Sequence, residues 1–236
     1  MDPYSRALSK INRVADRPEG FSGPFLELIP ASGAAVSTIG EFLGNETLSS
    51  TSPQAARVDE LQFDLGEGPC WDAMRSARPV LRPDVASAAE LWPAFTDAMV
   101  VEKIHSIYAF PLLVGSLRIG AVDIYSHQPL VLSETQARDA SALAGVTGRY
   151  VLRHALENIQ GEVEGPEAIT RGFPRRVVHQ ATGMVMAQLG LSADDATLVI
   201  QGHAFAASRS VMETAQAIVE RELDISDPDQ TGEGPV

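Results

Sequence analysis

Cysteine is nearly absent from this sequence. Only Cys70 occurs among the 236 residues, so an internal disulfide is impossible and the disulfide-stabilised secreted domains are excluded. Long hydrophobic runs are also missing, because apolar stretches such as 107–114 are far shorter than the about 20 residues that span a bilayer. The N-terminus lacks the basic and apolar segments of a secretory signal. We therefore expect a cytoplasmic protein that does not enter a membrane.

Positive charge is scarce as well. The chain has 18 Lys and Arg residues against 31 Asp and Glu residues, a net charge of −13. Such a surface repels phosphate backbones at long range, so binding of a nucleic acid would need a local patch or a matching shape. Residues 166–225 are less acidic, with five basic and seven acidic side chains, whereas 226–236 has three acidic and no basic ones. We expect this last segment to be a disordered acidic tail.

Enzyme and metal-site signatures are missing too. Ser22 lies in Gly-Phe-Ser-Gly, which is not a nucleophile elbow. Gly66 and Gly68 lack the third glycine and the lysine of a phosphate-binding loop. The five histidines are not spaced as metal ligands. Cys70 has no resolving partner, which argues against a thiol-dependent enzyme. We therefore predict a non-catalytic protein without a cofactor or a metal.

The N-terminal two thirds have the pattern of an α+β domain. Hydrophobic residues make up 44% of the chain, enough for a packed core. Alternation, capping and turn residues predict strands at 34–39, 46–51, 79–82, 106–114 and 117–125, and helices at 4–14, 25–31, 53–63, 70–76, 92–103 and 133–160. Gly115-Ser116 is typical of a two-residue hairpin turn. We expect an antiparallel sheet with helices on one face, while the other face or a loop-lined hollow stays free for a ligand.

A linker and a helical unit follow this domain. Residues 161–166 contain two glycines, two glutamates and a proline, which indicates a linker. Ser192 and Ser210 each precede an acidic residue by three positions, the spacing of a helix N-cap. With Pro174 at the first start and Gly190 at the first end, these signals divide the segment into three short helices. We therefore predict a compact three-helix bundle within 167–225, as in an output or contact module.

Apolar positions of the first predicted helix cover an unusually broad surface. They are Val177, Val178, Ala181, Met184, Val185 and Leu189. One apolar stripe would serve a single neighbour, so two stripes favour burial against both the bundle and a second chain.

The C-terminal segment also resembles a known family. The run His179-Gln-Ala-Thr-Gly-Met-Val-Met-Ala-Gln-Leu-Gly190, followed by Leu-Ser-Ala-Asp-Asp-Ala196 and His-Ala-Phe-Ala206, is similar to ANTAR modules. This resemblance implies an RNA-binding antitermination module, a bundle that dimerises through its first helix and binds paired stem-loops in a transcript leader. Many ANTAR members carry a lysine where this chain has Thr182 and an arginine where it has Gln201, so both departures remove positive charge.

Upstream motifs resemble a second family. Residues 61–73, Trp92-Pro-Ala-Phe95 and Gly120-Ala-Val-Asp-Ile-Tyr125 are similar to GAF sensor domains, in the pattern of actinobacterial GAF–ANTAR proteins. The resemblance covers roughly 20–160 and implies a domain that senses a small molecule, which the sequence does not identify, or serves as a dimer platform. Trp71 and Trp92 could line a ligand hollow or belong to the core. Cys70 could be a redox-sensing thiol or a small buried residue.

Candidate RNA contacts follow from the first of these resemblances. They are Arg171, Arg175, Arg176, His179, Thr182, Gln188, His203 and Arg209. Arginines would contact phosphates, while histidine and glutamine would hydrogen-bond bases. The alternatives are solvated surface arginines, histidines in caps or in the core, and helix packing for Thr182.

Two functions therefore remain open. The first is an RNA-binding transcription antitermination regulator, a homodimer in which the long helix ending near 160 couples the sensor to the bundle. The second is a protein-interaction or dimerisation module that has lost RNA binding, which the acidic balance and Thr182 favour.

Overall fold

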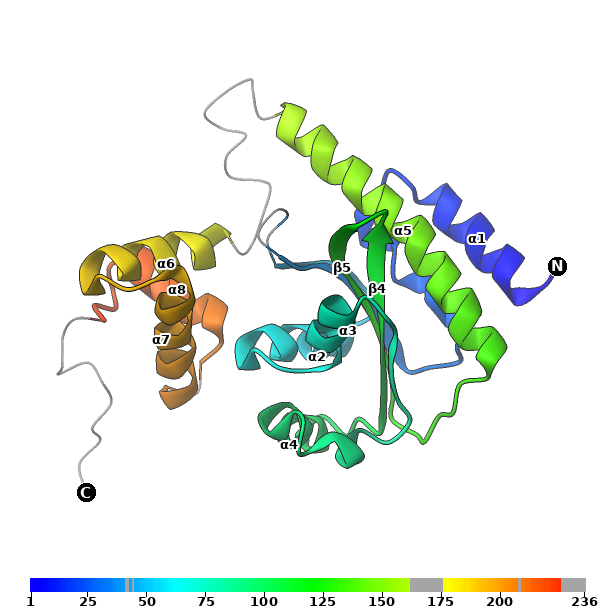
Figure 1. The fold of residues 1–236 in the computed structure, drawn as a ribbon, viewed down its shortest axis with the longest axis horizontal. Coiled ribbons are helices and arrows are strands. Elements are labelled where there is room, and N and C mark those ends of the chain that lie inside the picture. Colours follow the sequence, from blue (N-terminus) through cyan, green and yellow to red (C-terminus); the bar gives the residue numbers. More distant parts are fainter. Residues whose placement is uncertain (41–42, 44, 162–175, 208, 226–236) are drawn as a thin grey trace. The chain divides into compact units, whose positions relative to one another are not determined.

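The computed structural model describes residues 1–40, 43, 45–161, 176–207 and 209–225. The chain divides into two compact units, Met1–Gly172 and Phe173–Val236, and each unit is described by itself (Figure 1). Apart from Gly161, the predicted linker lies outside the described residues, as does the predicted acidic tail.

A five-stranded antiparallel sheet forms the centre of the first unit. Its strands are β1 (Gly33–Thr38), β2 (Glu46–Ser50), β3 (Val80–Arg82), β4 (Ser106–Val114) and β5 (Leu117–Ser126). They lie in the order β2-β1-β5-β4-β3. The predicted hairpin joins β4 to β5, with Gly115 at φ 61°, a conformation that glycine adopts without strain. β5 is therefore the middle strand, paired with both β1 and β4.

The pairing of β1 with β5 depends on a glycine. A Cβ atom on Gly120 would lie 1.9 Å from the backbone carbonyl oxygen of Ser37. Because backbone cannot move aside as the end of a side chain can, no larger residue fits there. Gly120 thus permits the close contact of the two strands from which Ser37 and Asp123 project.

Helices cover both faces of this sheet (Figure 1). They are α1 (Pro3–Arg13), α2 (Pro53–Leu65), α3 (Pro69–Ser76), α4 (Pro93–Val101) and α5 (Glu134–Gly161), with short 3₁₀ helices η1 (Pro18–Gly20), η2 (Gly23–Glu27) and η3 (Val85–Ala88). α1 and α5 pack with one face in the largest hydrophobic cluster, and α2, α3 and α4 lie on the other face in two smaller clusters. The expectation that one face stays free is therefore wrong, because helices cover both.

The second unit is a three-helix bundle. Its helices are α6 (Arg176–Leu189), α7 (Ala193–Ala206) and α8 (Val211–Val219). Both predicted N-caps are confirmed: the Ser192 side chain accepts from the Asp195 N–H at 3.2 Å, and Ser210 and Glu213 form a reciprocal capping box. Gly190 ends α6 at φ 66°. Small buried residues, among them Ala181, Ala196, Ala204 and Ala215, let the three helices pack closely.

Most local predictions of the sheet and helices are confirmed within one to three residues. Ser52 caps α2, accepting from the Ala55 N–H at 3.1 Å, with Pro53 in the first helical position. The helix expected at 25–31 is instead the 3₁₀ helix η2, which ends at Glu27, and β1 begins at Gly33. The 3₁₀ turns η1 and η3 were not predicted, because single turns leave no periodic apolar pattern.

Candidate functional site

A buried polar cluster lies between the sheet and α2. It contains Ser37 from β1, Thr47 from β2, Asp59 and Gln62 from α2, and Asp123 from β5. Asp59 and Gln62 are three positions apart and therefore lie on the same face of α2. Asp59 and Gln62 are fully buried and Asp123 is 3% exposed. Apolar clusters flank the group on this face of the sheet, so its polar atoms depend on one another for hydrogen bonds.

Hydrogen bonds satisfy most of the cluster. Ser37 Oγ donates to Asp59 Oδ1 at 3.0 Å, and Thr47 Oγ1 donates to the other Asp59 oxygen. Gln62 Nε2 donates to Asp123 Oδ2 at 2.9 Å, while Gln62 Oε1 accepts from the backbone N–H of Cys70 at 2.8 Å. Asp123 Oδ1 has no hydrogen-bond partner among the described residues. The carboxyl groups of Asp59 and Asp123 also interact directly in this buried site.

Burial raises the pKa of the Asp123 carboxyl well above its ordinary value, and the charge of neighbouring Asp59 raises this pKa further. In the unfolded chain the same carboxyl ionises near 3.8. Folding therefore favours the protonated form, and stability falls as pH rises from the unfolded pKa through the folded pKa. The two carboxyl groups form a charge-sensitive centre inside the first unit.

We expect Asp123→Asn to stabilise the first unit at pH 7 to 8. An asparagine can still accept from Gln62 and carries no charge beside Asp59, so removing the buried charge should contribute about 1–3 kcal/mol. The gain should shrink as pH falls and vanish well below pH 4, because wild-type Asp123 is then protonated in both states. Urea unfolding followed by tryptophan fluorescence at several pH values measures it. Asp97→Asn, on the exposed side of α4, is the control, and a loss of stability that grows with pH would contradict the account.

The turn before α3 is fitted closely to this cluster. Gly68 has φ 133°, and a Cβ atom there would lie 2.7 Å from Gln62 Oε1. Trp71 Nε1 donates to the backbone carbonyl of Gln62 at 2.7 Å. Cys70 is fully buried among Ile39, Phe63, Met74 and Ala121, which confirms the prediction of a small buried residue. These contacts hold the Gln62 amide in place under Asp123.

Trp92 belongs to the core of the first unit rather than to an open hollow. It is 1% exposed and packs with Phe95 at the start of α4. Its Nε1 donates to Asp72 Oδ2 at 3.1 Å, and the Arg82 guanidinium lies 5.4 Å from the centre of its ring. Of the two predictions for Trp92, the core residue is confirmed.

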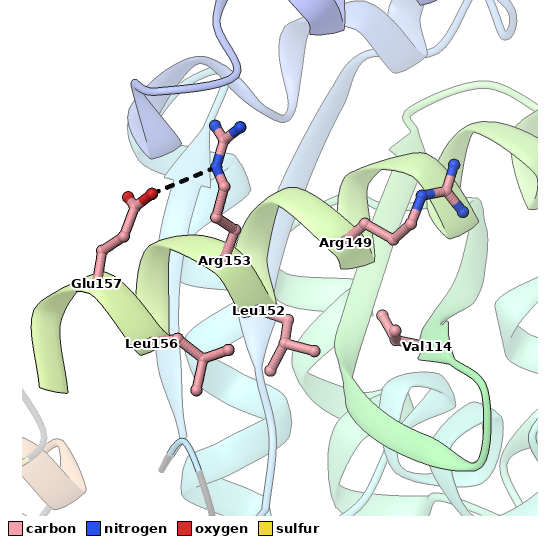
Figure 2. A pocket seen from close by; sticks show the side chains of 6 residues that line it. All are labelled: Val114, Arg149, Leu152, Arg153, Leu156 and Glu157. Carbon is pink, nitrogen blue, oxygen red and sulfur yellow. Dashed lines mark ion pairs between the residues drawn. The ribbon is translucent and has the colours of Figure 1, made fainter. Parts of the chain in front are cut away.

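A shallow hollow of about 310 Å³ lies along α5 on the opposite side of the sheet. Figure 2 shows Leu152 and Leu156 extending from one side of α5 and Arg153 and Glu157 from the other. Arg153 Nε and Glu157 Oε1 are 3.6 Å apart. This hollow is open and separate from the buried polar cluster, and Leu156 is 44% exposed beside it.

The predicted RNA contacts occupy different environments in the second unit. Arg171 and Arg175 lie outside the described residues, and Arg176 is the first residue of α6. His179, Gln188 and Arg209 are exposed, and His203 is partly exposed. Thr182 is only 8% exposed, and its hydroxyl donates to the Val178 carbonyl at 2.8 Å. The packing role for Thr182 therefore fits the structure, because its only side-chain donor bonds within α6.

Comparisons with known proteins match both units. The family model described as GAF domain matches residues 25–151, more than half of the chain, and the one described as ANTAR domain matches 174–219. The chain belongs to the GAF domain family and carries a C-terminal ANTAR domain. The architecture predicted from the sequence is thereby confirmed.

Solved structures agree on the fold of the GAF domain. The GAF domain of an Acinetobacter phosphoenolpyruvate-protein phosphotransferase is 15% identical, with a TM-score of 0.51, 66% of this chain covered and 96% of that chain. The chromophore-binding domain of a bacteriophytochrome from R. palustris is 11% identical, with a TM-score of 0.50, and the match covers 66% of this chain and 60% of that one. No curated protein matches the chain. At such identities the likeness concerns the fold alone.

The two domain types define the general role of the protein. ANTAR domains are RNA-binding antitermination domains, and GAF domains are sensory or dimerisation domains; both are regulatory and non-catalytic. Among the described residues, no helix is long and apolar enough to cross a membrane. Nor do three or more His, Cys, Asp or Glu side chains gather as a possible metal site in this part of the chain.

Sequence reasoning missed the buried polar cluster. Asp123 lies inside the run Gly120–Tyr125 that identified the GAF domain, where a carboxylate interrupts apolar residues of a central strand. A charged residue at the centre of a buried strand was the available signal, since such residues are almost never buried without a partner. The partner Asp59 could not be found, because the pairing depends on where α2 crosses the sheet.

Proposed function

We propose that the protein is a cytoplasmic, homodimeric regulator that binds paired stem-loops in a transcript leader through its ANTAR domain and favours transcription read-through. The ANTAR match over 174–219 is the observation that carries this proposal. The GAF domain would receive a signal or hold the two chains together.

The start of α6 supports an RNA-binding role. Arg171, Arg175 and Arg176 precede or begin this helix, and a helix N-terminus favours phosphate because its free N–H groups and its dipole are positive there. His179 is exposed one turn later. In our proposal this end of α6 contacts the RNA backbone, while Gln188, His203 and Arg209 supply further contacts.

Electrostatics limit how the bundle can bind RNA. Residues 166–225 carry five arginines and seven acidic residues, so this segment as a whole does not attract phosphate. Affinity would therefore come from a few local contacts and from the spacing of two loops on two bundles. Such binding weakens as salt rises. The slope of log affinity against log salt concentration is set by the few phosphates contacted.

The GAF domain offers two places where a signal could act. One is the buried carboxyl cluster beneath α2, and the other is the packing of α5 on the sheet. α5 spans 28 residues and ends at Gly161, the first residue of the predicted linker. A signal that shifts α5 would change the spacing of two bundles, provided that the ligand binds two states of the domain with different affinity.

The test is a salt titration of full-length protein with an RNA that carries two hairpin loops. Replacing both Arg175 and Arg176 by Gln should lower affinity about tenfold and reduce the log–log salt slope by about 1.4–1.8, since each phosphate contact contributes about 0.7–0.9. Arg221→Gln, at an exposed position after α8, is the matched control. Binding that is absent, or insensitive to salt, would contradict the proposal and favour the alternative of a protein-interaction module, which the acidic bundle also supports.

A further inference from the structure

The two buried carboxyl groups between α2 and the sheet receive different sets of hydrogen bonds. Asp59 accepts a hydroxyl donor at each of its two oxygens, from Ser37 at 3.0 Å and from Thr47. Asp123 accepts at Oδ2 from the Gln62 amide at 2.9 Å, whereas its Oδ1 receives no N–H or O–H donor among the described residues. Because donors stabilise the ionised form of a carboxyl group, Asp59 is the better placed of the two to carry a negative charge.

A proton on Asp123 Oδ1 would give both carboxyl groups a partner. The two groups interact directly, Asp59 is fully buried and Asp123 is 3% exposed, so little water can screen two charges at this point. A protonated Asp123 donates its O–H to the Asp59 carboxylate, whereas two ionised carboxylates in contact repel each other. Carboxyl pairs of this kind therefore hold a single proton and titrate as a unit.

The neighbouring strands and α2 present uncharged groups to the pair. They are a β1 hydroxyl, a β2 hydroxyl, an α2 amide and the β4 residue paired with Asp123, namely Ser37, Thr47, Gln62 and Ala109. On β5 the next titratable side chain is Tyr125, whose hydroxyl lies 3.3 Å from Ser52 Oγ. Burial and the Asp59 carboxyl raise the pKa of Asp123, and among the described residues only the Gln62 bond opposes them.

Titratable groups on the other packed elements are directed elsewhere. They are three residues at or near α3 and one on β2, namely Glu67, Cys70, Asp72 and Glu46. Glu67 accepts from the first turn of α4, Asp72 accepts from the Trp92 indole, and the Cys70 thiol is fully buried in an apolar cluster. Glu46 precedes Thr47, and successive side chains of a strand point to opposite faces. α4 meets α2 with apolar side chains.

We propose that Asp59 and Asp123 share one proton, and that loss of this proton as pH rises loosens α2 from the sheet and switches the GAF domain to a second state. Asp59 and Gln62 form the α2 half of the polar cluster and bond to β1, β2 and β5 at once. The proton is bound below the pKa of the folded pair, so the contact is closed at lower pH and opens as pH rises through that pKa.

Such a switch gives the GAF domain a signal that needs no bound molecule. Gln62 also accepts from the Cys70 N–H and, through its backbone carbonyl, from Trp71, so a shift of α2 reaches α3 as well. Any effect on RNA rests on the proposed function, in which the state of the GAF domain changes the affinity of the ANTAR domain. RNA affinity then follows the protonation of a carboxyl pair in the other domain.

Infrared spectroscopy of the full-length protein tests for the shared proton. At about pH 6 exposed Asp and Glu side chains are ionised, so the carbonyl band of a protonated carboxylic acid reports a buried one. We expect one such band in wild type, its absence in Asp123→Asn, and its presence in Asp97→Asn, a control at an exposed position of α4. A wild-type spectrum without the band, or an unchanged band in Asp123→Asn, would overturn the proposal.

Trp71 fluorescence shows whether α2 loosens while the domain stays folded. Trp71 is the only tryptophan of a Trp92→Phe variant, and its Nε1 donates to the Gln62 carbonyl at 2.7 Å. As pH rises we expect its emission to change in a transition that fits one proton, before the helical circular dichroism signal falls. Adding Asp123→Asn should remove the transition, because the asparagine N–H donates to Asp59 at every pH. The same transition in that double variant, or emission that changes only as the helices are lost, would rule the switch out.

Asp59→Asn is the matched variant that locates the proton. It removes the other carboxyl group, but its amide nitrogen replaces an oxygen that accepts from Ser37 or Thr47. One of these hydroxyls then loses its acceptor in a buried site, so we expect a folding equilibrium constant about 5- to 150-fold lower than in Asp123→Asn. Equal stability of the two variants, or the reverse order, would show that the proton does not lie on Asp123 and would contradict the proposal.

RNA affinity separates this proposal from the proposed function. With the two-hairpin RNA, wild-type affinity should change about 5-fold or more across the Trp71 transition, whereas Asp123→Asn should keep the affinity that wild type has at lower pH. A wild-type protein that shows the infrared band and the Trp71 transition but binds no RNA would contradict only the proposed function. RNA affinity with the same pH dependence in both proteins would overturn the role of the proton as a signal.

Discussion

Ile200→Ala is expected to unfold the ANTAR bundle and to abolish RNA binding while the GAF domain stays folded. Ile200 is fully buried at the centre of the bundle core, and such truncations cost about 2–5 kcal/mol. At about 0.05–0.15 kcal/mol per residue, a bundle of roughly 50 residues has only about 2.5–7.5 kcal/mol of stability. The loss of one core side chain is therefore comparable to the stability of the whole bundle.

Tryptophan fluorescence separates the two domains in this experiment. The only tryptophans are Trp71 and Trp92, and both lie in the GAF domain. Urea unfolding by fluorescence should not change in Ile200→Ala, whereas helical circular dichroism should lose part of its signal before any urea is added. Leu198→Ala removes the same number of carbon atoms from the exposed side of α7 and is the control, expected within about 0.5 kcal/mol of wild type. A parallel shift of both signals would show that the domains do not unfold separately.

Trp92→Ala should have the reciprocal effect. The side chain is 1% exposed, packs against Phe95, and donates to Asp72 across the helix layer. Removal of a buried tryptophan costs about 3–5 kcal/mol, and the Asp72 carboxylate also loses its indole partner. We expect the GAF domain to unfold at much lower urea, while the bundle keeps its helical signal and its intrinsic affinity for RNA.

Trp71 remains as the fluorescent probe of this variant. It lies against Phe63 and under Gln62, so its emission reports whether the polar cluster is intact. Trp92→Phe keeps most of the buried area and should recover most of the loss. If Trp92→Ala still binds RNA but its affinity no longer responds to any signal, the result would support separate sensing and binding domains. A GAF domain as stable as wild type would contradict the assigned core.

Local sequence signals predicted the elements well where the physics is local. Ser52, Ser192 and Ser210 each predicted a helix start through a cap that depends on three adjacent residues. Gly115 and Gly190 predicted a turn and a helix end, since both need a positive φ. Motif order then identified both domains. These signals need no knowledge of which elements meet in space.

Features that depend on tertiary contact were not predicted. The pairing of Asp59 with Asp123 joins α2 to β5 across 64 positions of the sequence. Whether helices cover both faces of the sheet depends on how α5 packs back over β4. The broad apolar surface of α6 suggested a second chain there. In the structure all of its predicted apolar residues except Leu189 pack in the bundle's own cluster, and a second chain on α6 stays a prediction, while α7 carries the more exposed Leu198 and Phe205. The seven-residue spacing of Leu198 and Phe205 places both on one side of α7. The more regular apolar pattern of the core residues on the same helix made this spacing hard to notice.

The most direct test of the central claim is sequencing of the transcripts that co-purify with the full-length protein from its own host. An antitermination regulator of this type should enrich leader sequences that hold two adjacent stem-loops overlapping a terminator, and the Arg175 and Arg176 double replacement by Gln should lose that enrichment. The account would be contradicted if the wild-type protein co-purified the same transcripts as the double variant and these held no paired stem-loops.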